Sequence, residues 1–114
     1  MELKNEIVLT LKENKSDKAI ISNIPLPSEV IIDGKNMDIS PTNWYELTPY
    51  VHAIIIKWDS PLTKCTNMFF DNNNLLTIDF SNFDSSQIND MESMFHGCIN
   101  LKSINFNNFN TSSV

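Results

Sequence analysis

The sequence predicts an α+β fold, in which a small β-rich module precedes a short stack of repeated strands and helices. Two observations lead to this prediction. Residues 1–60 contain segments in which apolar side chains recur at every second position, as they do in half-buried strands. Residues 61–114 contain a pattern that repeats after 26 residues, as the alignment of Met68 with Met94 shows. We therefore expect two parts, residues 1–60 and residues 61–114, with the first capping the second.

Composition limits the kinds of partner that the chain can bind. Its 114 residues fit a single domain, and the formal net charge is -6 with a sequence pI of about 4.6. Lysine and arginine form no basic stripe, so we do not expect nucleic-acid binding. The most apolar stretch, around 54–56, stops at Lys57 and is far too short to cross a bilayer, so we do not expect membrane insertion.

The first half is predicted to consist of strands and turns. Ile7, Leu9 and Leu11 share one face of a strand over residues 6–12. An Asp33-Gly34 turn predicts a tight hairpin between two further strands. The other expected elements are strands over 18–22 and 50–58 and a short helical turn from Ser40-Pro41 through Trp44 and Leu47. The aromatic residues are expected to cover the first repeat, with an aromatic contact patch as the alternative: Trp44, Tyr45, Tyr50 and Trp58.

The second half repeats its large apolar residues at a constant offset. The matching pairs are Met68/Met94, Phe69/Phe95, Leu75/Leu101, Ile78/Ile104, Phe80/Phe106 and Phe83/Phe109. This spacing lies in the range of leucine-rich repeats, and it predicts a short solenoid with one strand and one short helix in each 26-residue coil.

Each side of the repeat has an expected role. Ile78 and Phe80 should point inward, because strand side chains alternate between the two faces. A helix should begin at Asn89-Asp90, end near Gly97 and place one apolar stripe against the strand. That stripe comprises Met91, Met94 and Phe95. The outward residues of the two strands should form a polar row, which is our predicted binding site: Thr77, Asp79, Ser81, Ser103, Asn105 and Asn107.

Two strings in this half resemble a known family. Leu75-Leu76-Thr77-Ile78-Asp79-Phe80-Ser81-Asn82-Phe83-Asp84 and the Met94-Phe95-His96-Gly97-Cys98 motif are similar to the BspA-like (DUF285) leucine-rich repeat. The resemblance covers about residues 62–114. It implies a non-catalytic surface protein, for which adhesion to host matrix or to other cells is the usual proposal.

The sequence gives less support to catalysis or metal binding than to a binding surface. Asp79 and Asp84 could form an acid/base pair, but Asn105 and Asn110 replace them in the second repeat. His96 and Cys98 match no zinc spacing. The loop over 71–74 lacks the glycine and distal Glu of an EF-hand calcium site. We therefore expect no catalysis, metal or cofactor, and no enzyme within residues 1–60. Cys65 and Cys98 are expected to be buried free thiols.

The predicted function is a protein-interaction or adhesion module that binds an unidentified protein. The alternative is a structural or truncated repeat fragment without binding activity of its own. The last repeat is incomplete at Val114 and has no polar cap, so we expect the N-terminal part of a longer repeat protein, with self-association through this end as a further expectation. Without a signal peptide the default location is intracellular, whereas the resemblance implies the cell surface or secretion.

Overall fold

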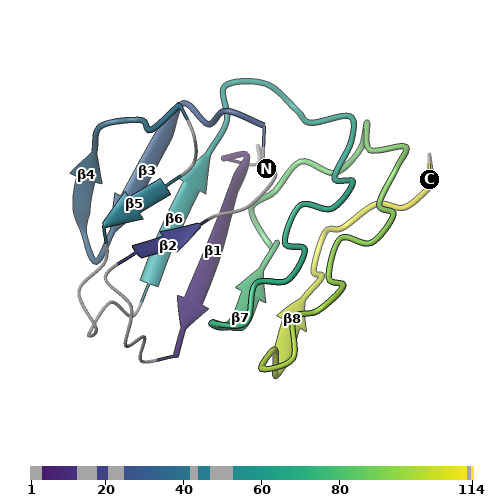
Figure 1. The fold of residues 1–114 in the computed structure, drawn as a ribbon. Helices are drawn as coiled ribbons and strands as arrows, with labels where there is room; N and C mark the ends of the chain where they lie inside the picture. The colour runs from purple at the N-terminus through teal and green to yellow at the C-terminus, as the bar shows by residue number, and fades with distance from the viewer. Residues whose placement is uncertain (1–3, 13–17, 21–24, 42–43, 47–52, 113) are drawn as a thin grey trace.

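The computed structural model describes residues 4–12, 18–20, 25–41, 44–46, 53–112 and 114. Eight strands form in this part of the chain (Figure 1): β1 (Glu6–Leu11), β2 (Lys18–Ile20), β3 (Glu29–Ile32), β4 (Lys35–Met37), β5 (Trp44–Glu46), β6 (Ala53–Lys57), β7 (Leu75–Asp79) and β8 (Ser103–Asn105). The described residues form no helix, and so they include no helix that could cross a bilayer.

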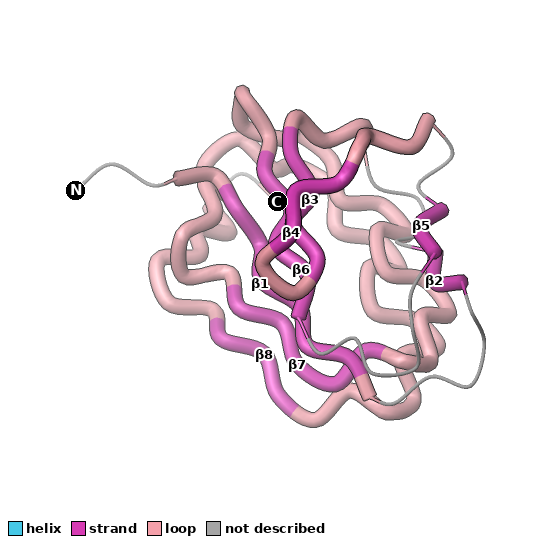
Figure 2. The backbone as a smooth tube through the Cα atoms, turned by 90° about the vertical axis from the view of Figure 1, so that its left-hand side faces the viewer, coloured by secondary structure: helices cyan, strands magenta, loops and turns pink. Residues whose placement is uncertain are grey.

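Six of the strands form one mixed sheet in the order β4-β3-β6-β1-β7-β8 (Figures 1 and 2). Neighbouring strands are antiparallel except for β7 and β8, which are parallel. Strands β2 and β5 pair separately. Because β1 lies between β6 and β7, the sheet is continuous across residue 60. The predicted division of the chain at that residue stays a prediction.

Alternation along the strands positions the core on one side of the large sheet. Ile7 and Leu9 of β1 are fully buried, as are Ile54 and Ile56 of β6 to within 1%. The predicted strand over residues 6–12 and the Asp33-Gly34 hairpin are confirmed. Both hairpin residues have positive φ, at 46° and 83°, which is the backbone that a two-residue I′ turn requires.

The predicted helical turn after Ser40 is wrong where the structure describes it. Trp44–Glu46 is strand β5, which pairs with β2. Tyr45 is buried, and its hydroxyl oxygen accepts a hydrogen bond from the Ser40 amide at 3.1 Å. The positions of Leu47 and Tyr50 lie outside the described residues. Trp58 packs edge-on against Phe83 of the first repeat, with ring centroids 6.0 Å apart, as predicted for the covering aromatic residues.

The predicted α+β class and the strand-plus-helix solenoid are also wrong, because the described residues are all β and turn. The segment from Asn89 through Phe95 forms successive tight turns instead of a helix. Amide groups of Met94, His96 and Cys98 each donate to the carbonyl three residues earlier. The equivalent turns of the first repeat are closed by the amides of Met68, Phe70 and Asn72.

Hydrogen bonds between the amides of the first repeat and the carbonyls of the second explain why neither segment forms a helix. The Asn67 amide donates to the Glu92 carbonyl at 2.9 Å, and the Phe69 amide donates to the Met94 carbonyl at 2.9 Å. The Cys65 and Asp71 amides make the same kind of bond to the second repeat. A helix needs every interior amide for a bond within its own segment. Here alternate amides of the first repeat and alternate carbonyls of the second repeat bond to each other, so the two segments pair as stacked turns.

Backbone conformation follows the same repeat. Asn67 and Ser93, which are equivalent positions, have φ of 56° and 54°. Asp71 and Gly97 are also equivalent, with φ of 57° and 79°. A Cβ at position 97 would lie 1.9 Å from a carboxylate oxygen of Asp71 and 3.0 Å from its Cα. The left-handed backbone favours glycine at position 97, and the close approach of Asp71 leaves no room there for a Cβ.

Aromatic rings stack from one repeat to the next at the predicted offset. Phe80 and Phe106 lie 5.6 Å apart at 14°, and β7 and β8 pair with Ile78 opposite Ile104. The inward orientation of Ile78 and Phe80 is confirmed, since both are at most 1% exposed. Phe106 is 46% exposed, because the second repeat has a neighbour on one side only.

The two cysteines are free thiols, Cys65 in the turns of the first repeat and Cys98 in those of the second. Cys65 is buried, and burial raises the pKa of its thiol to about 12. Cys98 is half-buried, and its Sγ donates to the Phe69 carbonyl at 3.0 Å. Burial also raises the pKa of the Cys98 thiol. The expectation of free thiols is confirmed, and that of full burial holds for Cys65.

Replacing Phe80 by alanine should lower the free energy of unfolding by about 3–5 kcal/mol, because it opens a cavity beneath both repeats. The equivalent change Phe106→Ala is the matched control and should cost about 1–2 kcal/mol, since much of that ring is already in water. Urea unfolding followed by circular dichroism measures both values. Equal losses would contradict the packing described above.

Thiol alkylation should distinguish the two cysteines. A pKa of about 12 leaves roughly one thiol in ten thousand as the reactive thiolate near pH 8 for Cys65. Iodoacetamide should therefore modify Cys98 before Cys65 in the native protein, and both more slowly than in the protein unfolded by guanidinium. Peptide mass spectrometry measures the two rates. Native Cys65 reacting as fast as in the unfolded chain would show that this turn does not lie in the core.

Candidate functional site

The side of the six-stranded sheet that faces away from the core carries the candidate site, and we call it the outer face. Its central part is apolar. Val8 of β1 lies opposite Ile55 of β6, and Ile55 lies opposite Ile31 of β3. All three side chains are half-buried, although they point away from the buried residues of the same strands. We call these three residues the apolar strip.

A charged row borders the apolar strip. Lys57 of β6 lies between Glu6 of β1 and Glu29 of β3 in the strand register. Its ammonium group is 3.7 Å from a carboxylate oxygen of each glutamate. Two carboxylates therefore share one ammonium group, which leaves this row with a net negative charge.

The predicted binding residues extend the outer face across the two repeats. Thr77 pairs with Ser103 and Asp79 pairs with Asn105 in the parallel register of β7 and β8. On the other side of β7, Thr10 and Val8 of β1 lie opposite Thr77 and Asp79. The Thr10 and Thr77 hydroxyl groups share a hydrogen bond. The polar row therefore continues directly from the apolar strip.

Ser81 and Asn107 lie beyond the ends of these strands, in turns. The Ser81 amide donates to Oδ1 of Asp79 at 2.8 Å, and the Asn107 amide donates to Oδ1 of Asn105 at 2.9 Å. Asp79 and Asn105 thus close equivalent turns. The structure brings four of the six predicted residues into one sheet face and gives the other two to the turns beside it.

Asp84 has the same role one turn later. Its Oδ1 accepts hydrogen bonds from the Ser86 amide at 3.0 Å and from the Ser86 hydroxyl at 2.6 Å. These bonds hold the pKa of the Asp84 carboxyl below its ordinary value. In the second repeat, Asn110 accepts the equivalent bond from Ser112 at 2.9 Å. Asp79 and Asp84, the possible acid/base pair, therefore both close turns through hydrogen bonds. The uncharged Asn105 and Asn110 close the equivalent turns, so this role does not need a negative charge.

The other chemical candidates find little support among the described residues. No group of three His, Cys, Asp or Glu side chains there is arranged to hold a metal ion. His96 stacks on Phe70, with ring centroids 4.8 Å apart. Asp71, the first residue of the loop considered for calcium, donates its amide to the His96 carbonyl at 2.7 Å. These residues join the two repeats to each other.

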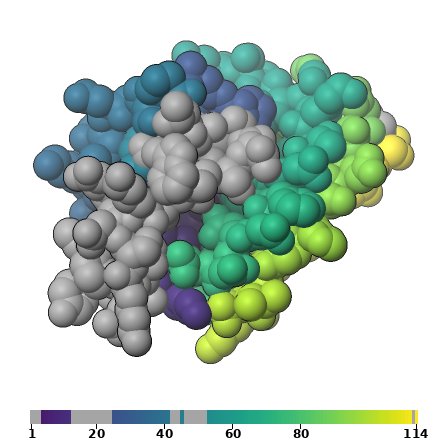
Figure 3. Space-filling model, in the orientation of Figure 1, coloured from purple at the N-terminus to yellow at the C-terminus, as the bar shows by residue number. Residues whose placement is uncertain are grey.

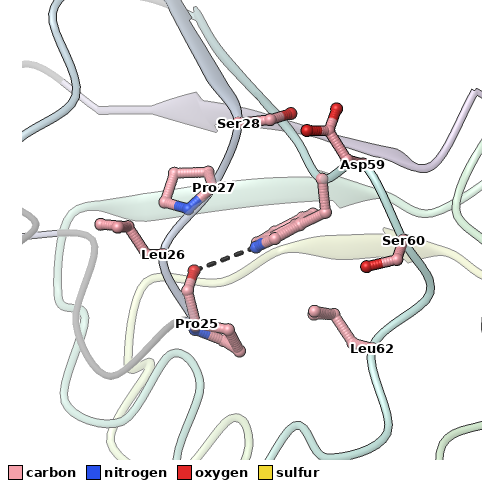
Figure 4. Close-up of a pocket in the computed structure, with 8 residues that line it drawn as sticks. Pro25, Leu26, Pro27, Ser28, Asp59, Ser60 and Leu62 are labelled. Carbon is pink, nitrogen blue, oxygen red and sulfur yellow. Dashed lines mark hydrogen bonds between the residues drawn. The ribbon is translucent and has the colours of Figure 1, made fainter.

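A shallow cavity of about 320 Å³ lies beside the end of β6 (Figure 4). Its walls are both polar and apolar, and the Trp58 indole nitrogen donates to the Pro25 carbonyl at 2.9 Å. The remaining polar groups at its rim include Asp59 and Ser60. The lining residues are Pro25, Leu26, Pro27, Ser28, Trp58, Asp59, Ser60 and Leu62. Its tryptophan is already hydrogen-bonded, so the outer face is the stronger candidate.

Comparison with known proteins identifies the family. No curated protein and no solved structure matches the chain. A family model described as "Mycoplasma protein of unknown function, DUF285" matches residues 42–114, which is more than half of the chain. The match includes β6, β7, β8 and both repeats, and it confirms the resemblance seen in the sequence. The chain therefore belongs to the DUF285 family.

Proposed function

We propose that this chain is a non-catalytic protein-binding module that uses the outer face of its large sheet as the contact surface. The observation that carries the proposal is the apolar strip of Val8, Ile31 and Ile55. In an antiparallel sheet with one side packed on a core, the other side is usually polar. Neighbouring apolar side chains across three central strands, bordered by polar rows, are typical of a surface that another protein covers.

Charge indicates the chemistry of the partner. The strip is bordered by Glu6 and Glu29 on one strand row and by Asp79 at its end. The whole chain has a formal net charge of -6. A complementary partner would present an apolar patch surrounded by lysine or arginine side chains. Adhesion is the case in which that partner belongs to another cell or to a matrix, and the BspA-like resemblance is its support.

The second candidate is a purely structural chain. The observation that favours it is the role of Asp79 and Asn105 in closing equivalent turns, because this role explains two residues of the polar row without any partner. It does not explain the apolar strip. A test of function therefore has to act on the strip and leave the turns intact.

Replacing Ile55 by lysine should weaken partner binding by at least about tenfold, because it introduces a charge in the centre of the apolar strip. The aliphatic part of lysine can lie along the sheet, so the fold should persist, and a thermal melt checks this. Ile99→Lys is the matched control, since Ile99 is 79% exposed and belongs to a turn of the second repeat.

The measurement is quantitative affinity capture with the three proteins side by side, followed by calorimetric titration of each captured partner in purified form. A partner lost by Ile55→Lys and retained by Ile99→Lys supports the outer face. If every captured protein binds the folded Ile55→Lys variant as tightly as the parent chain, the outer face is not the binding surface.

A further inference from the structure

The shallow cavity beside the end of β6 has a polar end and an apolar end. Its lining residues belong to the segments 25–28, before β3, and 58–62, after β6, which lie side by side at the top of Figure 3. Figure 4 shows Ser28 and Asp59 at one end of the cavity, which we call the polar end, and Pro25 and Leu62 at the other, the apolar end. A cavity of about 320 Å³ is at the lower end of the range for ligand sites, about 300–1,000 Å³, and so it suits one side chain better than a large ligand.

Hydrogen bonds hold both walls of the cavity in place. The Ser28 amide and hydroxyl both donate to the Lys57 carbonyl, at 2.8 and 3.1 Å. The side-chain amide of Asn5 donates to the carbonyls of Trp58 and Ser60 on the other wall. The prolines of the segment 25–28 have a fixed φ, which limits the movement of that wall further. The cavity is therefore formed before a ligand arrives, and binding needs little ordering of the chain.

The polar groups of the cavity favour a cation over an anion. The indole N–H of Trp58 is already used by the Pro25 carbonyl, and no lysine, arginine or histidine is among the lining residues. Asp59 supplies a carboxylate, which forms no ion pair or hydrogen bond within the part of the chain that the structure describes. The Ser28 hydroxyl oxygen at the same end can accept a hydrogen bond.

The charges around the cavity do not change this preference. The segments 4–6, 25–29 and 57–64 contain three basic and three acidic side chains, whose formal charges cancel: Lys4, Lys57, Lys64, Glu6, Glu29 and Asp59. Lys57 lies between the two glutamates, 3.7 Å from each. Neither Lys4 nor Lys64 forms an ion pair with Asp59. The surroundings are therefore neutral overall, and a cation is favoured by the position of one unpaired carboxylate in the cavity wall.

From these observations we infer that the cavity binds one lysine or arginine side chain of the protein partner. The aliphatic part of that side chain lies against the apolar end, and its charged group contacts the carboxylate of Asp59. The inference rests on the proposed function, because the side chain belongs to the protein that covers the outer face. The cavity is next to that face, since Ser28 precedes Glu29 and Asp59 follows Lys57 by two residues in the chain.

The test uses n-butylguanidinium, which has the aliphatic stem and the charged head of an arginine side chain. It is titrated into the labelled 114-residue chain at low ionic strength, and nuclear magnetic resonance follows the Trp58 indole N–H and the Leu62 methyl groups. The Kd should be on the order of 10 mM, as expected for so small a molecule. The control compounds n-butanol and n-butyrate have the same stem with a neutral or a negative head, and should bind at least about threefold more weakly.

Asp59→Asn should weaken the binding of n-butylguanidinium at least about threefold, because it removes the charge and keeps the shape of the side chain. Asp71→Asn is the matched control and should bind like the parent chain. Asp71 precedes β7, whereas Asp59 follows β6, and both strands run antiparallel to β1, so the two aspartates lie at opposite ends of the sheet. Three results would overturn the inference: no signal change up to about 50 mM, equally tight binding of n-butyrate, or equal weakening by the two variants.

Ile55→Lys separates this inference from the proposed function. The variant should bind n-butylguanidinium like the parent chain, because Ile55 is not among the lining residues of the cavity, whereas it should lose the protein partner. Asp59→Asn should weaken that partner too. A partner that binds Asp59→Asn as tightly as the parent chain would overturn the inference and leave the outer face in place. A partner weakened by Asp59→Asn but not by Ile55→Lys would instead support the cavity and contradict the outer face.

Discussion

The backbone hydrogen bonds between the two repeats determine most of the fold. From Cys65 to Asp71, every second amide donates to a carbonyl of the next repeat, at distances between 2.7 and 2.9 Å. Between them, the amides of Met68 and Phe70 close tight turns within their own repeat. These bonds satisfy buried backbone groups without forming a helical segment. The same ladder brings equivalent side chains together, which is why Phe80 stacks on Phe106 and β7 pairs with β8 in register.

Strand β1 connects this ladder to the rest of the chain. It lies between β6 and β7, so the N-terminal segment provides both the centre of the large sheet and the cover of the first repeat. Asn5, which precedes β1, reinforces the connection, because its side-chain amide donates to the carbonyls of Trp58 and Ser60 at 3.1 and 2.8 Å. This arrangement places β1 in the middle of the outer face, between β6 and β7.

The sequence predicted the features that depend on apolar periodicity. Alternation identified Ile7 and Leu9 as core residues, and the internal repeat placed Ile78 opposite Ile104. Apolar periodicity gave the wrong prediction, a helix, for the segment around Met91, Met94 and Phe95. Spacings of three and four residues are typical of a helix, but successive turns whose backbone bonds to a neighbour produce them too. These turns depend on positive φ at Asn67 and Ser93. Neither residue type predicts a positive φ from the sequence as a glycine would.

The polar half of the candidate site was predictable and the apolar half was missed. Thr77 and Asp79 follow directly from alternation beside Ile78. The apolar strip had a signal in the three consecutive isoleucines at 54–56, because a strand with apolar residues at every position has two apolar faces. That signal becomes a surface only when β3, β6 and β1 are known to be neighbours, which depends on long-range pairing.

The most direct test of the ladder is a nuclear magnetic resonance experiment that detects couplings across hydrogen bonds in the labelled protein. Our account predicts a coupling between the amide nitrogen of Phe69 and the carbonyl carbon of Met94, which belong to different repeats. A coupling between the amide of Phe95 and the carbonyl of Met91, with none between the repeats, would instead establish the helix and contradict the stacked turns.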